Sequence, residues 1–212
     1  MEEKDKKEKI LEVAEELFAQ KGFEGTSVRE LAKKAKINVA MISYYFGSKE
    51  RLFESLVEFR AGFMREKLQL LHREEGMDPM SKMERLVDYY VDRVTSNNRF
   101  SRILHRELSL QQRSEMHHAI TDILLRNANE MRGIIHEGIH KKVFRDIDAE
   151  MLIATLVGTT MQATNSKEMV CKLIGTDRDK FTFNDTRHKN RIKRYLKDLM
   201  RSYLLIKNST RA

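Results

Sequence analysis

Apolar residues recur every three or four positions along most of the chain, and this spacing is typical of amphipathic α-helices. The first stripe predicts a helix over about residues 5–20, with Gly22 as its C-terminal stop. Its apolar residues are Ile10, Val13, Ala14, Leu17 and Phe18. Polar residues fill the other positions, so one face of this helix is expected to pack against its neighbours.

Further stripes predict helices through the rest of the chain. Asp78 followed by Pro79 marks a helix start, because Asp caps a helix and Pro suits its first turn. The expected helices run from about 48 to 74, from 79 to a break at Asn97 and Asn98, from there past Leu108, from Ser114 to near Lys141, from about Asp148 past Gln162, and through Ile192 to Ile206. Residues of about 166–185 are expected to be irregular or to hold one short helix.

Two short helices with a tight turn between them are predicted within residues 26–49. Ser27 and Glu30 stand three residues apart and form a capping box for the first helix. Asn38 is a second cap candidate. Behind it, Ile42 and Phe46 are four residues apart and therefore point inward together. This is the helix-turn-helix pattern, whose second helix enters a DNA major groove.

Residues around this pattern stand at a characteristic spacing: Gly22, Phe23, Thr26, Ser27, Val28, Arg29, Leu31, Ala32 and Ala35, then Ile42, Tyr45, Phe46, Lys49, Glu50 and Leu52. They resemble the amino-terminal signature of the tetracycline-repressor (TetR) family, over roughly the first quarter of the chain. Two positions depart from the family pattern. Lys36 stands where the family usually has a Gly with a left-handed backbone, and Ser43 stands where it usually has Tyr.

The resemblance implies roles in DNA binding. Ser27, Arg29 and Lys49 would reach phosphates, and Lys36 adds positive charge in the turn. The residues that match the recognition helix are Val39, Ala40, Met41, Ser43, Tyr44 and Tyr45. Because this helix has no Arg, Asn or Gln, it would read thymine methyls more than hydrogen-bonding edges. The simpler alternative for Val39 and Tyr45 is packing against the first helix.

Composition supports an all-α fold of about nine helices. The 212 residues include one Pro and one Cys, 34% are charged, and we find no β-rich runs. No apolar run approaches the ~20 residues of a membrane span, and the polar amino terminus is unlike a secretory signal. The single Cys171 suits a reducing cytoplasm, with a structural role favoured over redox sensing.

The net charge of +8 is unevenly distributed. Residues 26–51 carry six Lys or Arg against two Glu, which gives +4, and residues 187–212 carry nine against one Asp, which gives +8. A basic helix-turn-helix favours phosphate partners. For the basic final helix, a solvated helix face is the simpler interpretation.

The larger part of the chain is expected to bind an unidentified small-molecule effector, as the resemblance implies. Residues that mix polar and apolar character on predicted inner faces are Tyr89, Phe100, Asn127, Met131 and Gln162. Asn127 interrupts an apolar stripe, and a neighbouring side chain is a simpler partner for its amide than a ligand. No cofactor is expected. His136 and His140 have a spacing that can bind metal, but the absence of a third clear ligand argues against a metal site or a helical enzyme.

The sequence therefore predicts a helix-turn-helix domain at residues 1–50 and a helical effector-binding and dimerisation domain at residues 51–212. The function would be that of a cytoplasmic, ligand-responsive regulator, a repressor rather than an enzyme, which binds a palindrome in double-stranded DNA as a homodimer through its last two long helices. An all-helical protein-interaction module with a vestigial helix-turn-helix remains the alternative.

Overall fold

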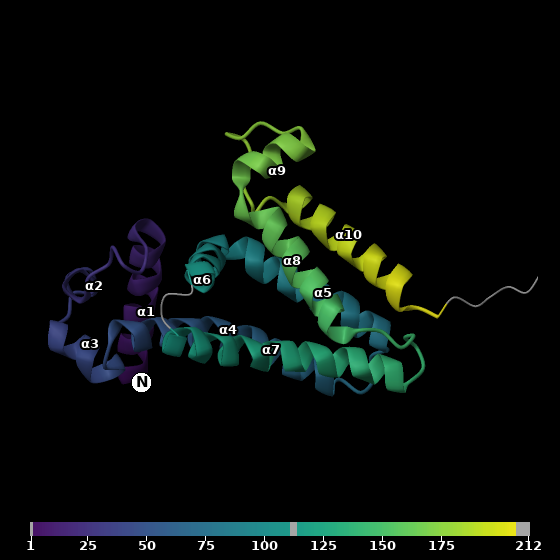
Figure 1. Ribbon diagram of the computed structural model, residues 1–212, viewed down its shortest axis with the longest axis horizontal. Helices are drawn as coiled ribbons and strands as arrows, with labels where there is room; N and C mark the ends of the chain where they lie inside the picture. Colours follow the sequence, from purple (N-terminus) through teal and green to yellow (C-terminus); the bar gives the residue numbers. More distant parts are fainter. Residues whose placement is uncertain (1, 111–113, 207–212) are drawn as a thin grey trace, which may run out of the picture. The chain divides into compact units, whose positions relative to one another are not determined.

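The computed structural model describes residues 2–110 and 114–206, and it confirms the predicted all-α fold (Figure 1). Within these residues there are ten helices and no named strand. They are α1 (Glu2–Lys21), α2 (Val28–Ala35), α3 (Val39–Phe46), α4 (Lys49–Arg73), α5 (Pro79–Ser96), α6 (Asn98–Leu110), α7 (Ser114–His140), α8 (Ala149–Asn165), α9 (Lys167–Ile174) and α10 (Thr186–Leu204). None of the described helices combines the length and the apolar character that crossing a membrane requires.

Side-chain caps define the starts of several helices. The Asp78 carboxylate accepts hydrogen bonds from the backbone N–H groups of Met80 and Ser81, both at 3.0 Å, with Pro79 at the first helical position. Asp148 caps α8 in the same way. Both caps confirm the predicted helix starts, because capping depends only on residues close together in the sequence.

The chain divides into two compact units, each formed from two segments. Unit 1 comprises Met1–Phe63 and Arg99–Leu125, and unit 2 comprises Met64–Asn98 and Arg126–Ala212. Helices α4 and α7 contribute residues to both units. The predicted boundary after residue 50 stays a prediction.

Three phenylalanine rings form the centre of unit 1. Phe18 of α1, Phe23 of the following turn and Phe53 of α4 lie in mutual contact, with ring centroids 5.4, 5.5 and 5.6 Å apart. Leu31 and Ile42 are buried in the same cluster, so Phe23 fills the small core expected for it. This cluster fixes α2 and α3 against α1 and α4.

In unit 2, α10 packs against α5 and α8 (Figure 1). A ladder of ion pairs lines the contact between α5 and α10. The pairs are Lys193 with Asp92 at 2.8 Å, Lys197 with Asp88 at 2.7 Å, and Arg201 with Glu84 at 2.6 Å. The basic final helix is therefore not solely a solvated face, because one edge of it is paired with acids about a hundred residues earlier.

A lysine is buried at another helix junction of unit 2. The Lys82 ammonium, whose side chain is 2% exposed, donates hydrogen bonds to the carboxylate of Glu137 at 2.8 Å and to the backbone carbonyl of His72 at 2.9 Å. Burial opposes ionisation of Glu137, but hydrogen bonds from Lys141 and Lys82 outweigh it and lower its pKa. These bonds connect α4, α5 and α7 through charges that need one another.

Candidate DNA interface

The predicted capping box begins α2. The Ser27 hydroxyl oxygen accepts a hydrogen bond from the Glu30 N–H at 3.2 Å, and the Glu30 carboxylate accepts one from the Ser27 N–H at 3.1 Å. A hydrogen bond from Lys21 at 2.5 Å, followed by those from Ser27, lowers the pKa of Glu30 to about 2. The start of α2 is thus fixed by ordinary local chemistry.

Between α2 and α3 the chain turns through a left-handed residue. Lys36 has φ +56° and ψ +45°, which is the helix-ending conformation that Gly adopts most easily. The Ile37 N–H bonds to the Ala32 carbonyl at 3.0 Å, and the Asn38 side chain accepts from the Ala40 N–H at 2.9 Å. Lys36 therefore adopts a strained left-handed backbone conformation at an exposed position in the turn.

We expect Lys36→Gly to stabilise the protein by about 1 kcal/mol, because Gly relieves the left-handed strain. The same change removes a charge, so the slope of log affinity for duplex DNA against log salt is expected to fall by about 0.9 if Lys36 contacts a phosphate. Thermal unfolding and a salt titration measure the two effects. Lys36→Ala is the control, since it removes the charge but keeps the strain; equal stability of the Gly and Ala variants would contradict the explanation.

Helix α3 has one buried face and one open face. Ile42 and Phe46 are buried in the unit 1 cluster, as predicted. Tyr44 is 76% exposed, and Ala40 and Ser43 are exposed beside it. The outward face of α3 is therefore small and lightly polar around one tyrosine ring.

The remaining recognition-helix candidates differ in exposure. Val39 is exposed at the start of α3, whereas Met41 and Tyr45 are half-buried. The Tyr45 ring lies edge-on to Tyr44 at 5.2 Å, and the Lys7 ammonium lies 5.4 Å from its centre. Tyr45 also packs against the unit 1 cluster, so it supports Tyr44 from behind.

Cationic side chains are exposed on α2 and in the turn that precedes α3. Arg29 and Lys36 are exposed on and just after α2, where Ser27 is also exposed. Lys49 is different, because its ammonium donates to the backbone carbonyls of Phe23 at 3.0 Å and Thr26 at 3.1 Å. It also lies 4.4 Å from the centre of the Phe23 ring. Lys49 thus ties the turn before α2 to the start of α4, a role that no sequence spacing indicated.

Arg106 of α6 is a second residue of unit 1 that sequence reasoning missed. Its guanidinium donates to the Phe18 carbonyl near the end of α1 at 3.2 Å. It lies so close to Gly22, which has φ +81°, that a Cβ there would come within 2.9 Å of Nη2. The sequence indicated that Gly22 ends the first helix. It did not indicate that Arg106, 84 residues later, packs against Gly22.

The five predicted effector residues are divided between the two units. Phe100 is buried in the unit 1 cluster, whereas Met131 is buried in the main core cluster of unit 2. Asn127 accepts a hydrogen bond from Arg65 at 3.1 Å, so a neighbouring side chain does satisfy its amide oxygen. Tyr89 is half-buried on α5, and Gln162 is exposed on α8. Their role in effector binding stays a prediction.

His136 and His140 are four residues apart on α7, a spacing that can bind a metal ion. Within residues 2–110 and 114–206, no group of three or more His, Cys, Asp or Glu side chains is placed to hold a metal ion. The structure therefore adds no partner ligand for His136 and His140 within that range.

Family models match both halves of the chain. Residues 10–56 match the model described as bacterial regulatory proteins, tetR family. Residues 79–193, more than half of the chain, match the model described as tetracyclin repressor-like, C-terminal domain. The first match covers the whole candidate DNA interface, and the second runs from the start of α5 into the first half of α10.

Curated relatives and solved structures agree with these matches. The probable HTH-type transcriptional regulator YttP of Bacillus subtilis (strain 168) is 33% identical over 159 residues, covering 73% of this chain and 75% of that protein. The HTH-type transcriptional repressor NicS of Pseudomonas putida is 33% identical over 159 residues, covering 71% and 73%. The structure of the regulator FadR from Bacillus subtilis in complex with stearoyl-CoA has a TM-score of 0.71 at 21% identity, covering 89% of this chain and 96% of that one.

Proposed function

The chain belongs to the tetracycline-repressor (TetR) family of bacterial regulatory proteins, and we propose that it is a ligand-responsive repressor that binds a palindromic operator as a homodimer. The observation that carries the proposal is the open face of α3. A capped turn precedes this helix, Tyr44 is exposed on it, and Arg29 and Lys36 are exposed on α2 and in the turn. A bacterial transcriptional repressor acts in the cytoplasm. Repression by operator binding needs no catalytic activity.

Each group in this interface has a role in the proposal. The small side chains of α3, Ala40 and Ser43, let the helix approach the groove closely, and apolar contacts read thymine methyls. Tyr44 contacts a base edge or the sugar-phosphate backbone. Arg29 and the free N–H groups at the start of α2 hold phosphates and fix the register of the helix.

Two copies are needed because one short helix with few polar readers binds weakly. A symmetric dimer places two copies of α3 in successive major grooves, about 34–36 Å apart along the duplex. The two long helices α8 and α10 supply the pairing surface, and both carry exposed apolar side chains such as Met151 and Tyr195. Symmetry of the protein then requires an inverted repeat in the operator.

Release of the operator would follow from binding of a small molecule in unit 2. Helices α4 and α7 contribute to both units, so a change in their packing within unit 2 reaches the cluster that supports α3. The effector needs only to bind more tightly to the conformation that releases DNA than to the conformation that holds it. The neighbouring FadR structure contains stearoyl-CoA, which supports a ligand-responsive fold, although 21% identity does not carry the ligand over.

A protein-interaction module is the second candidate, and the near-absence of polar base readers on α3 favours it. Exposed Arg29 and Lys36 oppose it, because a protein partner does not require cations around that face. Retention on random duplex DNA across a salt series separates the two. Strong salt dependence supports the repressor, and its absence supports the interaction module.

Selection of bound duplexes from a random pool tests the proposal directly. We expect enrichment of an inverted repeat whose half-site centres are separated by about one helical turn, or a multiple of it. A pool that stays random after repeated selection at low ionic strength would refute the repressor.

Two substitutions test the assigned roles on the selected duplex. We expect Tyr44→Ala to weaken binding about tenfold, a loss of about 1.4 kcal/mol typical of one specific contact. Arg29→Ala should weaken all duplexes alike and lower the salt slope by about 0.9. Fluorescence anisotropy measures both, with Arg102→Ala on α6 as the control that removes the same charge outside the helix-turn-helix. If Arg102→Ala lowered the affinity and the salt slope as much as Arg29→Ala does, Arg29 would have no specific role at a phosphate.

A further inference from the structure

The segment between α8 and α10 is folded onto the start of α10. Val170, Cys171 and Phe181 are buried together in a small cluster of their own. The Phe181 and Phe183 rings lie 4.8 and 6.4 Å from the imidazole of His188, near the start of α10. These contacts hold α9 in place where α8 ends and α10 begins.

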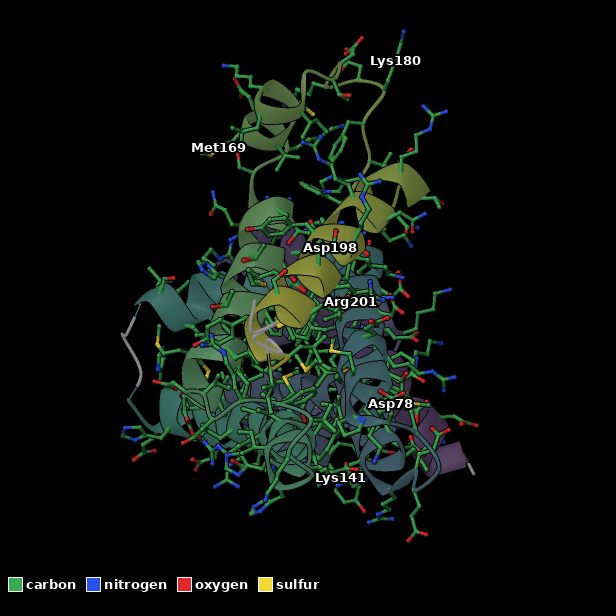
Figure 2. All side chains as sticks on the ribbon, turned by 90° about the vertical axis from the view of Figure 1, so that its right-hand side faces the viewer. Asp78, Lys141, Met169, Lys180, Asp198 and Arg201 are labelled. Carbon is green, nitrogen blue, oxygen red and sulfur yellow. The ribbon has the colours of Figure 1, made fainter. Side chains whose placement is uncertain are left out.

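Helices α8, α9 and α10 border a hollow of about 670 Å³, which we call the α9 hollow. Its volume lies within the range of about 300–1,000 Å³ that is usual for small-molecule pockets. Large apolar side chains line it, and Leu173 is 72% exposed, Tyr195 56% and Met169 50%. Figure 2 shows Met169 at the outer edge of α9, with Asp198 on α10 below it. The hollow therefore offers apolar surface to a ligand.

One cation stands in this apolar lining. Of the twelve lining residues only Arg191 is an aspartate, glutamate, lysine or arginine, although 34% of the chain consists of these residues. Arg191 is exposed on α10, and within the part of the chain that the structure describes its guanidinium has no carboxylate partner. It differs in this from Lys193 and Lys197 on the same helix, which are paired with acids of α5. A free guanidinium can donate two parallel hydrogen bonds to a carboxylate.

His188 is also in the wall of the hollow, but it adds no charge at neutral pH. Burial lowers the pKa of His188, a hydrogen bond with the Ala163 carbonyl opposes this, and the positive charge of Arg191 lowers the pKa further. The imidazole is therefore neutral at pH 7. The formal charge of the lining is that of Arg191 alone, and it favours an anion.

We infer that the α9 hollow binds a small amphipathic organic acid, with its apolar body against Met169, Leu173 and Tyr195 and its carboxylate on the Arg191 guanidinium. One guanidinium balances one carboxylate, whereas a phosphate group carries about −1.5 to −2 charges at pH 7 and would stay partly unbalanced. A neutral apolar ligand leaves Arg191 without a partner, and a cation is repelled by it. The inference rests on the proposed ligand-responsive function and deepens it, because it gives the effector a site and a chemical class.

Gly158 of α8 provides a steric test of the site. It lies in the wall of the hollow, and no atom lies within 4 Å of where its Cβ would be. Gly158→Leu therefore fills the hollow without a clash, and leucine also suits a helix better than glycine does. Gly62→Leu is the matched control, since Gly62 of α4 has equally open space but belongs to unit 1.

Isothermal titration calorimetry of the full chain with octanoate tests the inference. We expect Gly158→Leu and Arg191→Gln each to raise the dissociation constant about tenfold or more, and Gly62→Leu to leave it unchanged. Arg191→Lys keeps the positive charge and should retain most of the affinity. The probe 1-octanol has the same chain without the charge, and it should bind the wild type about tenfold more weakly than octanoate. Circular dichroism checks that each variant is folded.

The outcomes separate this inference from the proposed repressor. Octanoate that binds Gly158→Leu and Arg191→Gln as tightly as the wild type lies elsewhere, and this overturns the inference. A wild type that binds no octanoate, or binds 1-octanol equally well, also overturns it. These titrations contain no DNA, so a chain that fails them and still selects an inverted repeat loses the inference and keeps the repressor proposal.

Discussion

Replacing Phe53 with alanine is expected to destabilise unit 1 by about 3–5 kcal/mol and to abolish operator binding near the growth temperature. The Phe53 ring is fully buried and contacts both Phe18 and Phe23 at the point where α1, the following turn and α4 meet. Its removal leaves a cavity that these rigid neighbours cannot fill. Chemical unfolding measures the loss of stability, and anisotropy with the selected duplex measures the loss of binding.

Phe63→Ala is the matched control for this prediction. Phe63 lies on the same helix within unit 1, but half of its side chain is exposed, and it contacts Phe59 with ring centroids 5.0 Å apart. Its truncation should cost no more than about 1 kcal/mol. If both variants lost stability equally, the three-ring cluster would not be the support of the DNA-binding helices.

Glu137→Leu has the second largest expected effect, a destabilisation of unit 2 by about 3–5 kcal/mol. The substitution removes the counter-charge of the buried Lys82 ammonium, whose other described partner is the His72 carbonyl. An ammonium in that place must either stay charged without compensation or lose its proton. Denaturant unfolding at neutral pH measures the change.

The double variant Lys82→Met/Glu137→Leu shows whether the charge is the cause. Because two apolar side chains of similar length need no counter-charge, it should recover most of the lost stability. The pair also predicts a pH dependence of the wild type. The pKa of Glu137 is lower in the folded chain, so its contribution is present above the ordinary carboxylate pKa and is lost as the pH falls through the folded value. A double variant no more stable than Glu137→Leu would contradict this explanation.

Features set by neighbouring residues could be predicted from the sequence. The capping box of Ser27 and Glu30 and the Asp78 cap with Pro79 are both found where they were expected. Each depends on chemistry within about four residues, and the helical periodicity of the apolar stripes is equally local. The all-α fold and the helix-turn-helix followed from such signals.

Features set by contacts between distant residues could not be predicted. The ammonium of Lys49 bonds to carbonyls 23 and 26 residues away, a contact that its sequence position did not indicate, and its role at a phosphate stays a prediction. The basic face of α10 meets the acids of α5 across about a hundred residues, as between Lys193 and Asp92. Periodicity shows that a helix has an inner face, but it does not show which helix covers that face.

The effector residues illustrate the same difficulty. Phe100 and Met131 both lie on predicted inner faces, and both are buried, but they belong to the cores of different units. Gln162 instead lines a hollow between α8, α9 and α10. A mixed polar and apolar inner face indicates burial or binding, and only the packing of the helices distinguishes the two.

The measurement that tests the central claim most directly is native mass spectrometry of the protein with its selected duplex at low ionic strength. We expect complexes that contain two chains, or a multiple of two, on each inverted repeat, and a loss of these complexes in the Tyr44→Ala variant. A single chain bound to each duplex, or a protein that leaves every duplex unbound, would contradict it.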